Sequence, residues 1–223
     1  MASTTRGRLD NELSLVRDKI IQLSSLVDLA IAQSVEALER RDMELARHVV
    51  AQDNRINMIR YEIEEECLRI LATQQPAATD LRHVIVATHI AVELERIGDH
   101  AVGIAGIVNR METDPELQTL FRLPKMTRRA RRMVRESVQA FLDRDESLAH
   151  SVIQRDKKLD RHYLKLFRNL IKEMRGDEEA VRSGTFMLWV GHSLERMGDR
   201  ATNIAERVIF LTTGRYPELH PIL

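Results

Sequence analysis

The sequence carries the same five-residue motif, Glu-Arg-x-Gly-Asp, twice, 100 positions apart. Residues 95–99 read Glu-Arg-Ile-Gly-Asp and residues 195–199 read Glu-Arg-Met-Gly-Asp. A second pair of similar stretches precedes them in the same order, 52–57 and 155–160, at an offset of 103. Loops between helices absorb a difference of three residues, so the order and register predict an internal duplication. We place the two copies at residues 8–114 and 124–214.

Apolar residues follow a helical period through both copies. In residues 9–30 they recur at alternating steps of four and three, which predicts a continuous helix to about Arg40. The same pattern predicts further helices at about 45–74, 79–112, 126–142, 146–174 and 178–213, with Asp80 as a possible cap and residues 115–124 as the linker. Only 9 Gly, 5 Pro and 4% aromatic residues occur, which suits long helices better than sheets. The predicted fold class is all-α, an elongated bundle of nearly antiparallel helices.

Charge and composition limit the classes of protein that the chain can belong to. Its 34 basic and 34 acidic residues cancel, whereas nucleic-acid binders usually carry a basic surplus. One basic cluster, at residues 128–132, is interpreted as a solvated helix face or a partner site. Cys67 is alone and is expected to be buried. No unbroken apolar run approaches the ~20 residues that cross a bilayer, and we expect a cytoplasmic protein without a signal segment.

Acidic residues four positions apart are the strongest candidates for a binding site. Such residues share a helix face, about 5–6 Å apart, and like charges at that spacing repel each other. A multivalent cation would offset this cost, and facing helices would then form an all-oxygen cluster suited to Mg, Mn or Fe. A solvated face with salt bridges to neighbouring arginines and lysines explains the pattern equally well. The pairs are Asp53 with Asn57, Glu95 with Asp99, Asp156 with Asp160, and Glu195 with Asp199.

Two further residues of the repeated motif have structural interpretations. Gly98 and Gly198 cost about 1 kcal/mol each inside a helix, so their recurrence predicts close helix approach or room for a ligand. Arg96 and Arg196 are candidates for binding phosphate or a carboxylate, or for an interhelical salt bridge. The sequence has no phosphate-cradling glycine loop, zinc spacing or serine nucleophile motif, and it lacks the Glu-x-x-His of ferritin-like di-iron proteins.

These residues together resemble the PhoU family. The resemblance rests on both Glu-Arg-x-Gly-Asp motifs, the preceding Asp-x-x-Ile-Asn and Asp-x-x-Leu-Asp stretches, and Gln-Pro-x-x-x-Asp-Leu-Arg at 75–82, and it covers about residues 8–213. It implies two tandem antiparallel three-helix bundles. It also implies a non-enzymatic negative regulator of phosphate uptake and of the phosphate-starvation response. Such a regulator is a cytoplasmic adaptor between the ATPase subunit of a phosphate ABC transporter and a sensor histidine kinase.

The resemblance further implies a homodimer, peripheral to membrane complexes, and multinuclear metal sites holding Fe, Mn, Mg or Zn. Its ligands would be the residues of the four pairs. Asn57 departs from the acidic pattern, since a neutral amide can coordinate through its oxygen but compensates charge less well. The alternatives are a metal-binding or metal-buffering protein and, with least support, a metal-assisted hydrolase. The long apolar stripe of the first helix is a candidate dimer surface.

Overall fold

The computed structural model describes residues 2–110, 123–175 and 178–215. Within these ranges the chain forms six helices and no strand. The helices are α1 (Ala2–Arg40), α2 (Met43–Gln74), α3 (Ala78–Arg110), α4 (Leu123–Asp143), α5 (Glu146–Met174) and α6 (Glu178–Thr213). The all-α prediction is confirmed. Asp80 lies inside the first turn of α3 rather than at its cap, and most of the predicted linker falls outside the described residues.

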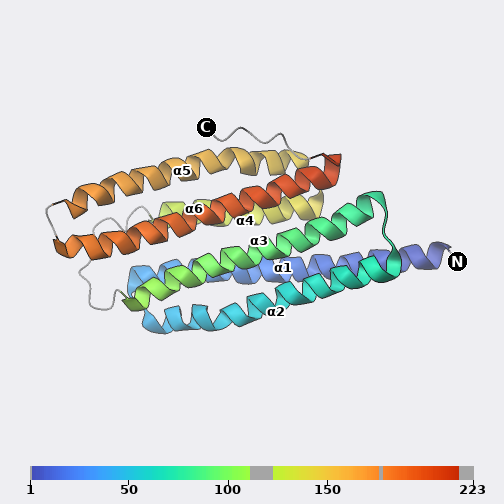
Figure 1. Cartoon of the computed structure of the whole chain (residues 1–223), viewed down its shortest axis with the longest axis horizontal. Coiled ribbons are helices and arrows are strands. Elements are labelled where there is room, and N and C mark those ends of the chain that lie inside the picture. The colour runs from blue at the N-terminus through green and yellow to red at the C-terminus, as the bar shows by residue number, and fades with distance from the viewer. Residues whose placement is uncertain (1, 111–122, 176–177, 216–223) are drawn as a thin grey trace.

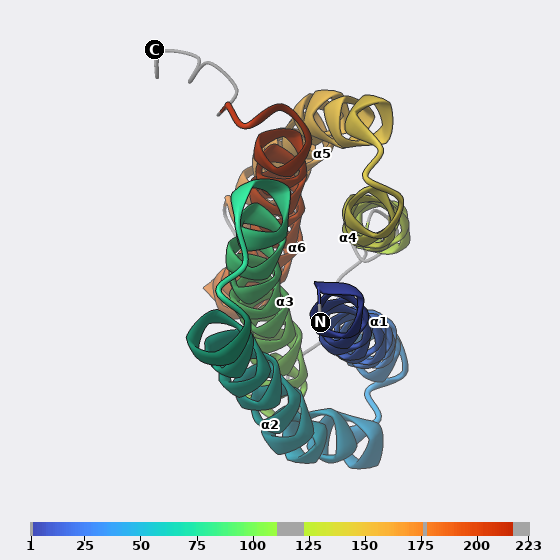
Figure 2. The ribbon, with the colours of Figure 1, turned by 90° about the vertical axis from the view of Figure 1, so that its right-hand side faces the viewer.

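The six helices lie nearly side by side along one axis and form an elongated body (Figure 1). Seen along that axis, α3 and α6 form one side, α1 and α4 form the other, and α2 and α5 close the two ends (Figure 2). Each half is therefore a three-helix bundle, α1 to α3 or α4 to α6. The third helices of the two halves pack against each other, which makes α3 and α6 the shared centre of the molecule.

The apolar stripe of α1 is buried inside the chain. Val16, Ile20, Leu23 and Val27 have no exposed surface, because α2, α3 and α4 all pack against this helix. The expectation that the stripe serves as a dimer surface is therefore wrong, since the chain covers it by itself. By length and composition the segment Gly7–Arg40 also meets the criteria for a membrane-spanning helix. A helix that packs one apolar face into a protein core meets the same criteria, and α1 packs in this way.

The same two-residue turn joins the first and second helix in each half. Arg41 and Arg144 adopt left-handed backbone angles, with φ of 52° and 53°. Asp42 and Asp145 follow them and cap α2 and α5, each accepting a hydrogen bond of 2.9 Å from the backbone three residues on. The amides of these aspartates also donate to a carbonyl five residues back, at 2.9 Å, which closes the preceding helix. The repeated Arg-Asp pair thus encodes a turn.

One member of the basic cluster holds the halves together. Arg131 of α4 donates two hydrogen bonds to Asp28 of α1, Nε to Oδ1 at 2.8 Å and Nη2 to Oδ2 at 2.6 Å. This planar two-point pairing is the strongest form of an arginine–carboxylate contact. Arg128 and Arg132 are exposed, as a solvated face requires. The predicted solvated face is therefore confirmed for Arg128 and Arg132 and is wrong for Arg131, which pairs within the chain.

Gly98 and Gly198 lie where two helices approach closely. A Cβ at Gly98 would meet Ile56 of α2 at 3.2 Å, and one at Gly198 would meet Leu159 of α5 at 2.5 Å. At Gly198 it would also lie 3.2 Å from Oδ1 of Asp156. The prediction of close helix approach is confirmed, and in the second half it brings a candidate ligand against α6.

We expect Gly198→Ala to destabilise the protein by up to about 2 kcal/mol. Overpacking against buried Leu159 costs about 1–3 kcal/mol, and the gain in helix propensity of about 1 kcal/mol offsets only part of it. Gly103→Ala is the matched control, because Gly103 is exposed in α3 with nothing within 4 Å, and it should stabilise by up to about 1 kcal/mol. Urea denaturation measures both. Equal stabilisation by the two substitutions would contradict the close approach at Gly198.

Candidate metal centre

The second half gathers its four acidic candidates along the seam between α5 and α6. Asp156 and Asp160 project from α5, and Glu195 and Asp199 project from α6, each partly buried. One carboxylate oxygen from each of Asp156, Asp160 and Asp199 lies within 4.8 Å of the others. The spacing of four on each helix and the packing of the two helices together produce this cluster, as the sequence pattern predicts.

Burial leaves several oxygens of this cluster without hydrogen bonds. Among the described residues, Oδ1 of Asp156 and Oδ1 of Asp160 are buried and have no hydrogen-bond partner. Burial, reinforced by the charges of Asp160 and Asp199, raises the pKa of Asp156 to about 7. An unpaired buried carboxylate is costly, and binding either a proton or a cation removes that cost. The cluster is therefore built to bind positive charge.

The other three acids respond to the same environment. Burial followed by the charge of Asp199 raises the pKa of both Asp160 and Glu195. Burial also raises the pKa of Asp199, although Arg196 opposes the shift by donating a hydrogen bond of 2.7 Å to its Oδ2. This pair lies within α6, so the expectation of an interhelical salt bridge for Arg196 is wrong.

Two residues outside the four acidic pairs, His192 and Glu206, border the cluster. His192 places Nδ1 3.2 Å from Oε2 of Glu195, one helical turn before it. Glu206 lies seven residues after Asp199, and its charge adds to the raised pKa of Asp156. A spacing of seven returns to the same helix face, so that spacing could have identified Glu206. The corresponding residue of the first half is Gly106.

The first half does not form an equivalent cluster of three carboxylates among the residues that the structure describes. Asn57 donates a hydrogen bond of 2.8 Å from Nδ2 to Oδ2 of Asp53, so its nitrogen faces the acid. Arg60 approaches Glu95 at 3.9 Å, while Asp99 is exposed. The pKa of Glu95 is nevertheless raised, by burial and by Asp99, and that of Asp99 by burial and by Asp53. The first-half acids thus lie near one another, with an amide and a guanidinium among them.

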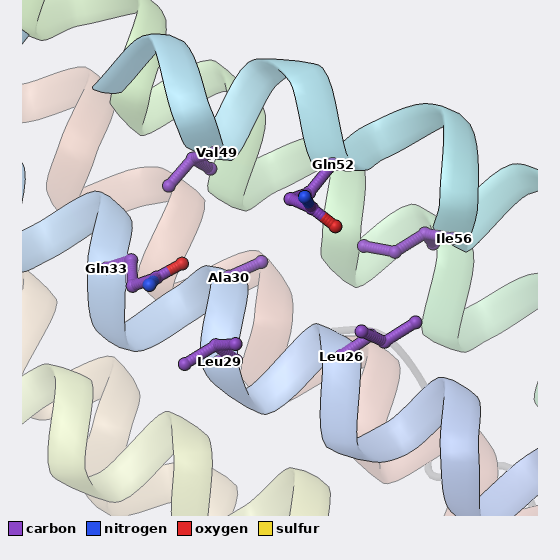
Figure 3. Close-up of a pocket in the computed structure, with 7 residues that line it drawn as sticks. All are labelled: Leu26, Leu29, Ala30, Gln33, Val49, Gln52 and Ile56. Carbon is purple, nitrogen blue, oxygen red and sulfur yellow. The ribbon is translucent and has the colours of Figure 1, made fainter. Parts of the chain in front are cut away.

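A small pocket lies between α1 and α2 in the first half (Figure 3). Ala30 of α1 and Val49 and Ile56 of α2 form its buried part, and the amides of Gln33 and Gln52 lie at the rim. Its volume of about 20 Å³ is enough for one water molecule. It has no charged lining residue, so it is not a part of either acidic set.

The donor set of the second half fits a hard or borderline cation. Four carboxylates offer only oxygen, which suits Mg, Mn or Fe better than thiolate-preferring ions. Asp156, Asp160, Glu195 and Asp199 are the residues that would hold such an ion, and its charge would compensate their mutual repulsion. The Arg196 contact leaves the second oxygen of Asp199 available.

Comparison with known proteins gives one consistent family. The model described as "PhoU domain" matches residues 20–108 and again residues 123–208. A Clostridium acetobutylicum protein named phosphate-specific transport system accessory protein PhoU homolog is 32% identical over 97% of this chain and 99% of its own length. The Escherichia coli accessory protein is 31% identical over 94% of this chain and 87% of its own length.

Solved structures give the same result for the fold. The crystal structure of PhoU from Pseudomonas aeruginosa superimposes with a TM-score of 0.88 at 38% identity, covering 92% of this chain and 99% of that one. The phosphate transport system regulatory protein PhoU from Streptococcus pneumoniae gives 0.87 at 32% identity, covering 95% and 100%. The tandem pair of three-helix bundles is therefore shared with both.

We expect the metal-free protein to lose stability as the pH rises from about 4 to about 7. Asp156 has a pKa of about 7 when folded and an ordinary value of 3.8, so within this window the folded state binds more protons than the unfolded state. As the pH passes about 7, Asp156 loses its proton in the folded state, and the stability that this proton contributed is lost. Asp156→Asn should make this decline shallower, and Asp53→Asn, where an amide faces the carboxylate, is the matched control. Urea denaturation with a chelator present, repeated across this pH range, gives the slopes. Identical slopes for wild type and Asp156→Asn would show that Asp156 does not carry the effect.

Proposed function

This chain belongs to the PhoU family, and from that premise we propose that it is a negative regulator of phosphate uptake and of the phosphate-starvation response. The family has an accessory and regulatory role in phosphate transport, and the chain matches its members along nearly its whole length. We propose further that it acts in the cytoplasm, without catalysis of its own, as an adaptor between the ATPase subunit of a phosphate ABC transporter and a sensor histidine kinase.

The difference between the two outer helices supports an adaptor with two different partners. α2 and α5 occupy corresponding places in the duplication and lie at opposite edges of the cross-section seen along the long axis (Figure 2). α2 carries four arginines and six acidic residues, whereas α5 carries seven lysines and arginines and four acidic residues. Complementary charge selects partners and steers their encounter. The chain thus presents two corresponding helices of opposite net charge.

Deleting the gene should leave phosphate-starvation genes active in medium that is rich in phosphate. The negative signal would then no longer reach the kinase, although transporter and kinase remain present. Transcript levels measured in wild type, deletion and complemented strains check this expectation. Normal repression in the deletion strain would refute the proposed regulator. Complementation with Lys157→Glu/Lys165→Glu and with Arg47→Glu/Arg55→Glu compares the α5 and α2 surfaces by equal charge changes.

We propose metal binding as a second function of the same chain. The observation that favours it is the convergence of three carboxylates, each with one oxygen within 4.8 Å of the others. In addition, Asp156 and Asp160 each have a buried Oδ1 without a hydrogen bond among the described residues. Fe, Mn and Mg match this oxygen-only set, and Zn would gain from His192 nearby. Bound metal would neutralise the α5–α6 seam and tie the two helices together.

Glu195→Ala/Asp199→Ala should remove most of the metal that copurifies with the protein. The double substitution takes away both carboxylates of α6, so the two on α5 cannot complete a site. Glu95→Ala/Asp99→Ala is the matched first-half control and should remove less, because Asn57 and Arg60 weaken that set. Elemental analysis of protein purified without chelators gives the content of each. Equal metal content in wild type and the second-half variant would refute the site.

A further inference from the structure

A separate cavity lies at one end of the long axis of the molecule, where α1, the start of α3 and the α4–α5 turn meet. Its volume is about 240 Å³. That is several times the roughly 30 Å³ that a water molecule occupies in the liquid, so it has room for a small anion with some of its hydration shell. None of the candidate metal ligands lines it. Its polar lining residues are Asp10, Ser14, Arg17, Asp80, His83 and Arg144.

His83 is the buried polar side chain of this cavity. It is only 8% exposed, and neither of its ring nitrogens has a hydrogen-bond partner among the described residues. One side of the ring packs near Phe141, with centroids 4.9 Å apart. Burial, assisted by the charge of Arg144, lowers the pKa of His83 to about 4, so the imidazole is neutral at physiological pH. A neutral imidazole offers one donor and one acceptor, and buried groups of this kind normally have partners.

Two guanidinium groups line the same cavity without an ion pair in the described part of the chain. Arg17 reaches it from α1, and Arg144 reaches it from the α4–α5 turn. The hydrogen bonds and ion pairs that the described side chains form do not include either guanidinium. Both charges lower the pKa of His83, as expected for cations that line the same cavity. Arginine pairs of this kind suit oxyanions, because each guanidinium can donate two parallel hydrogen bonds.

The carboxylates decide which oxyanion fits. Asp10 and Asp80 also line the cavity, so an anion there needs both acceptor oxygens for the arginines and a proton of its own to donate. Inorganic phosphate carries at least one proton throughout the neutral range, and a phosphomonoester, with a second pKa of about 6, carries one for part of the time. Sulfate has none, so the carboxylates repel it. We propose that this cavity binds a singly protonated phosphate group, as inorganic phosphate or as a phosphomonoester.

The binding site would give the proposed regulator a direct contact with the signal that it reports. This physiological meaning rests on the proposed function, but the binding itself does not. The cavity lies at the α4–α5 turn and shares no residue with the acidic seam of α5 and α6. Phosphate binding here should therefore persist in protein stripped of metal.

The repeated turn supplies a variant that removes one arginine without straining the fold. Arg144 occupies a left-handed backbone position, with φ of 53°, where glycine is the preferred residue. Arg144→Gly should therefore keep or raise stability while it removes a guanidinium from the cavity. Arg41→Gly is the matched control, because Arg41 occupies the same turn in the first half, with φ of 52°, at the opposite end of α1.

Isothermal titration of chelator-treated protein with inorganic phosphate tests the proposal. We expect saturable binding to wild type and to Arg41→Gly, and at least roughly tenfold weaker binding to Arg144→Gly and to Arg17→Met, which remove a charge-assisted pairing. His83→Leu keeps an apolar filler in the buried position and should also weaken binding. Thermal denaturation confirms that each variant is folded. No binding to the wild type, or equal binding to Arg144→Gly and Arg41→Gly, would overturn the proposal.

Two further titrations identify the ligand. Sulfate should bind at least roughly tenfold more weakly than phosphate, and equal binding would overturn the argument from the carboxylates. Phosphoserine and inorganic phosphate distinguish a phosphomonoester from the free ion, and tighter binding of either supports a phosphate group. If phosphate binds in vitro but the deletion strain still represses the phosphate-starvation genes, the proposed regulatory role is refuted and the binding site is not. If the deletion strain loses repression but the protein does not bind phosphate, the proposed phosphate site is refuted and the regulatory role is not.

Discussion

The burial of α3 and α6 is the constraint on which the rest of the structure depends. Each is the third helix of its half, and each packs against the other two helices of that half and against its counterpart. Leu94 and Leu194 have no exposed surface, and neither do Ile97 and Met197. Helices packed on three sides in this way place polar residues either on the face that remains exposed, as with Arg96, or along the seams with their neighbours. The acidic motifs follow these seams, which is why Glu95 and Glu195 are held beside the second helix of their half.

The sequence predicts the fold well because its apolar period extends through whole helices. Each described helix lies close to its predicted range, and the duplication is visible in register alone. The sequence also predicts which acids share a face. It does not predict which of them converge, because convergence depends on side-chain direction across two helices. Asn57 alone suggested that the halves differ, while the Arg60 contact with Glu95 and the proximity of Glu206 to Asp156 required the structure.

Repeated residues in this chain have repeated backbone roles and different surroundings. Arg41 and Arg144 form the same turn, yet only Arg144 lies beside a buried histidine and a cavity. Gly98 and Gly198 permit the same close approach, yet only Gly198 brings its helix against an aspartate oxygen. The backbone pattern is encoded locally and is therefore copied with the sequence. The chemical environment comes from helices far apart in sequence, so it differs between the copies.

This division explains how one duplicated fold can hold two unrelated kinds of site. A cluster of carboxylates without partners stabilises itself by taking up cations, while a pair of guanidinium groups without partners stabilises itself by taking up anions. Had Arg144 been placed in the acidic seam, the two sets would have neutralised each other as salt bridges, as Arg60 and Glu64 do at 2.7 Å in the first half. Their separation along α5, from the turn before its first residue to Asp156 and Asp160, keeps the guanidinium of Arg144 away from the acidic seam, where Arg196 already pairs with Asp199. The long helices that bury the core thus also hold these charges apart, and the buried groups without hydrogen bonds among the described residues, such as Oδ1 of Asp156 and the ring of His83, are the observations that support the two proposed sites.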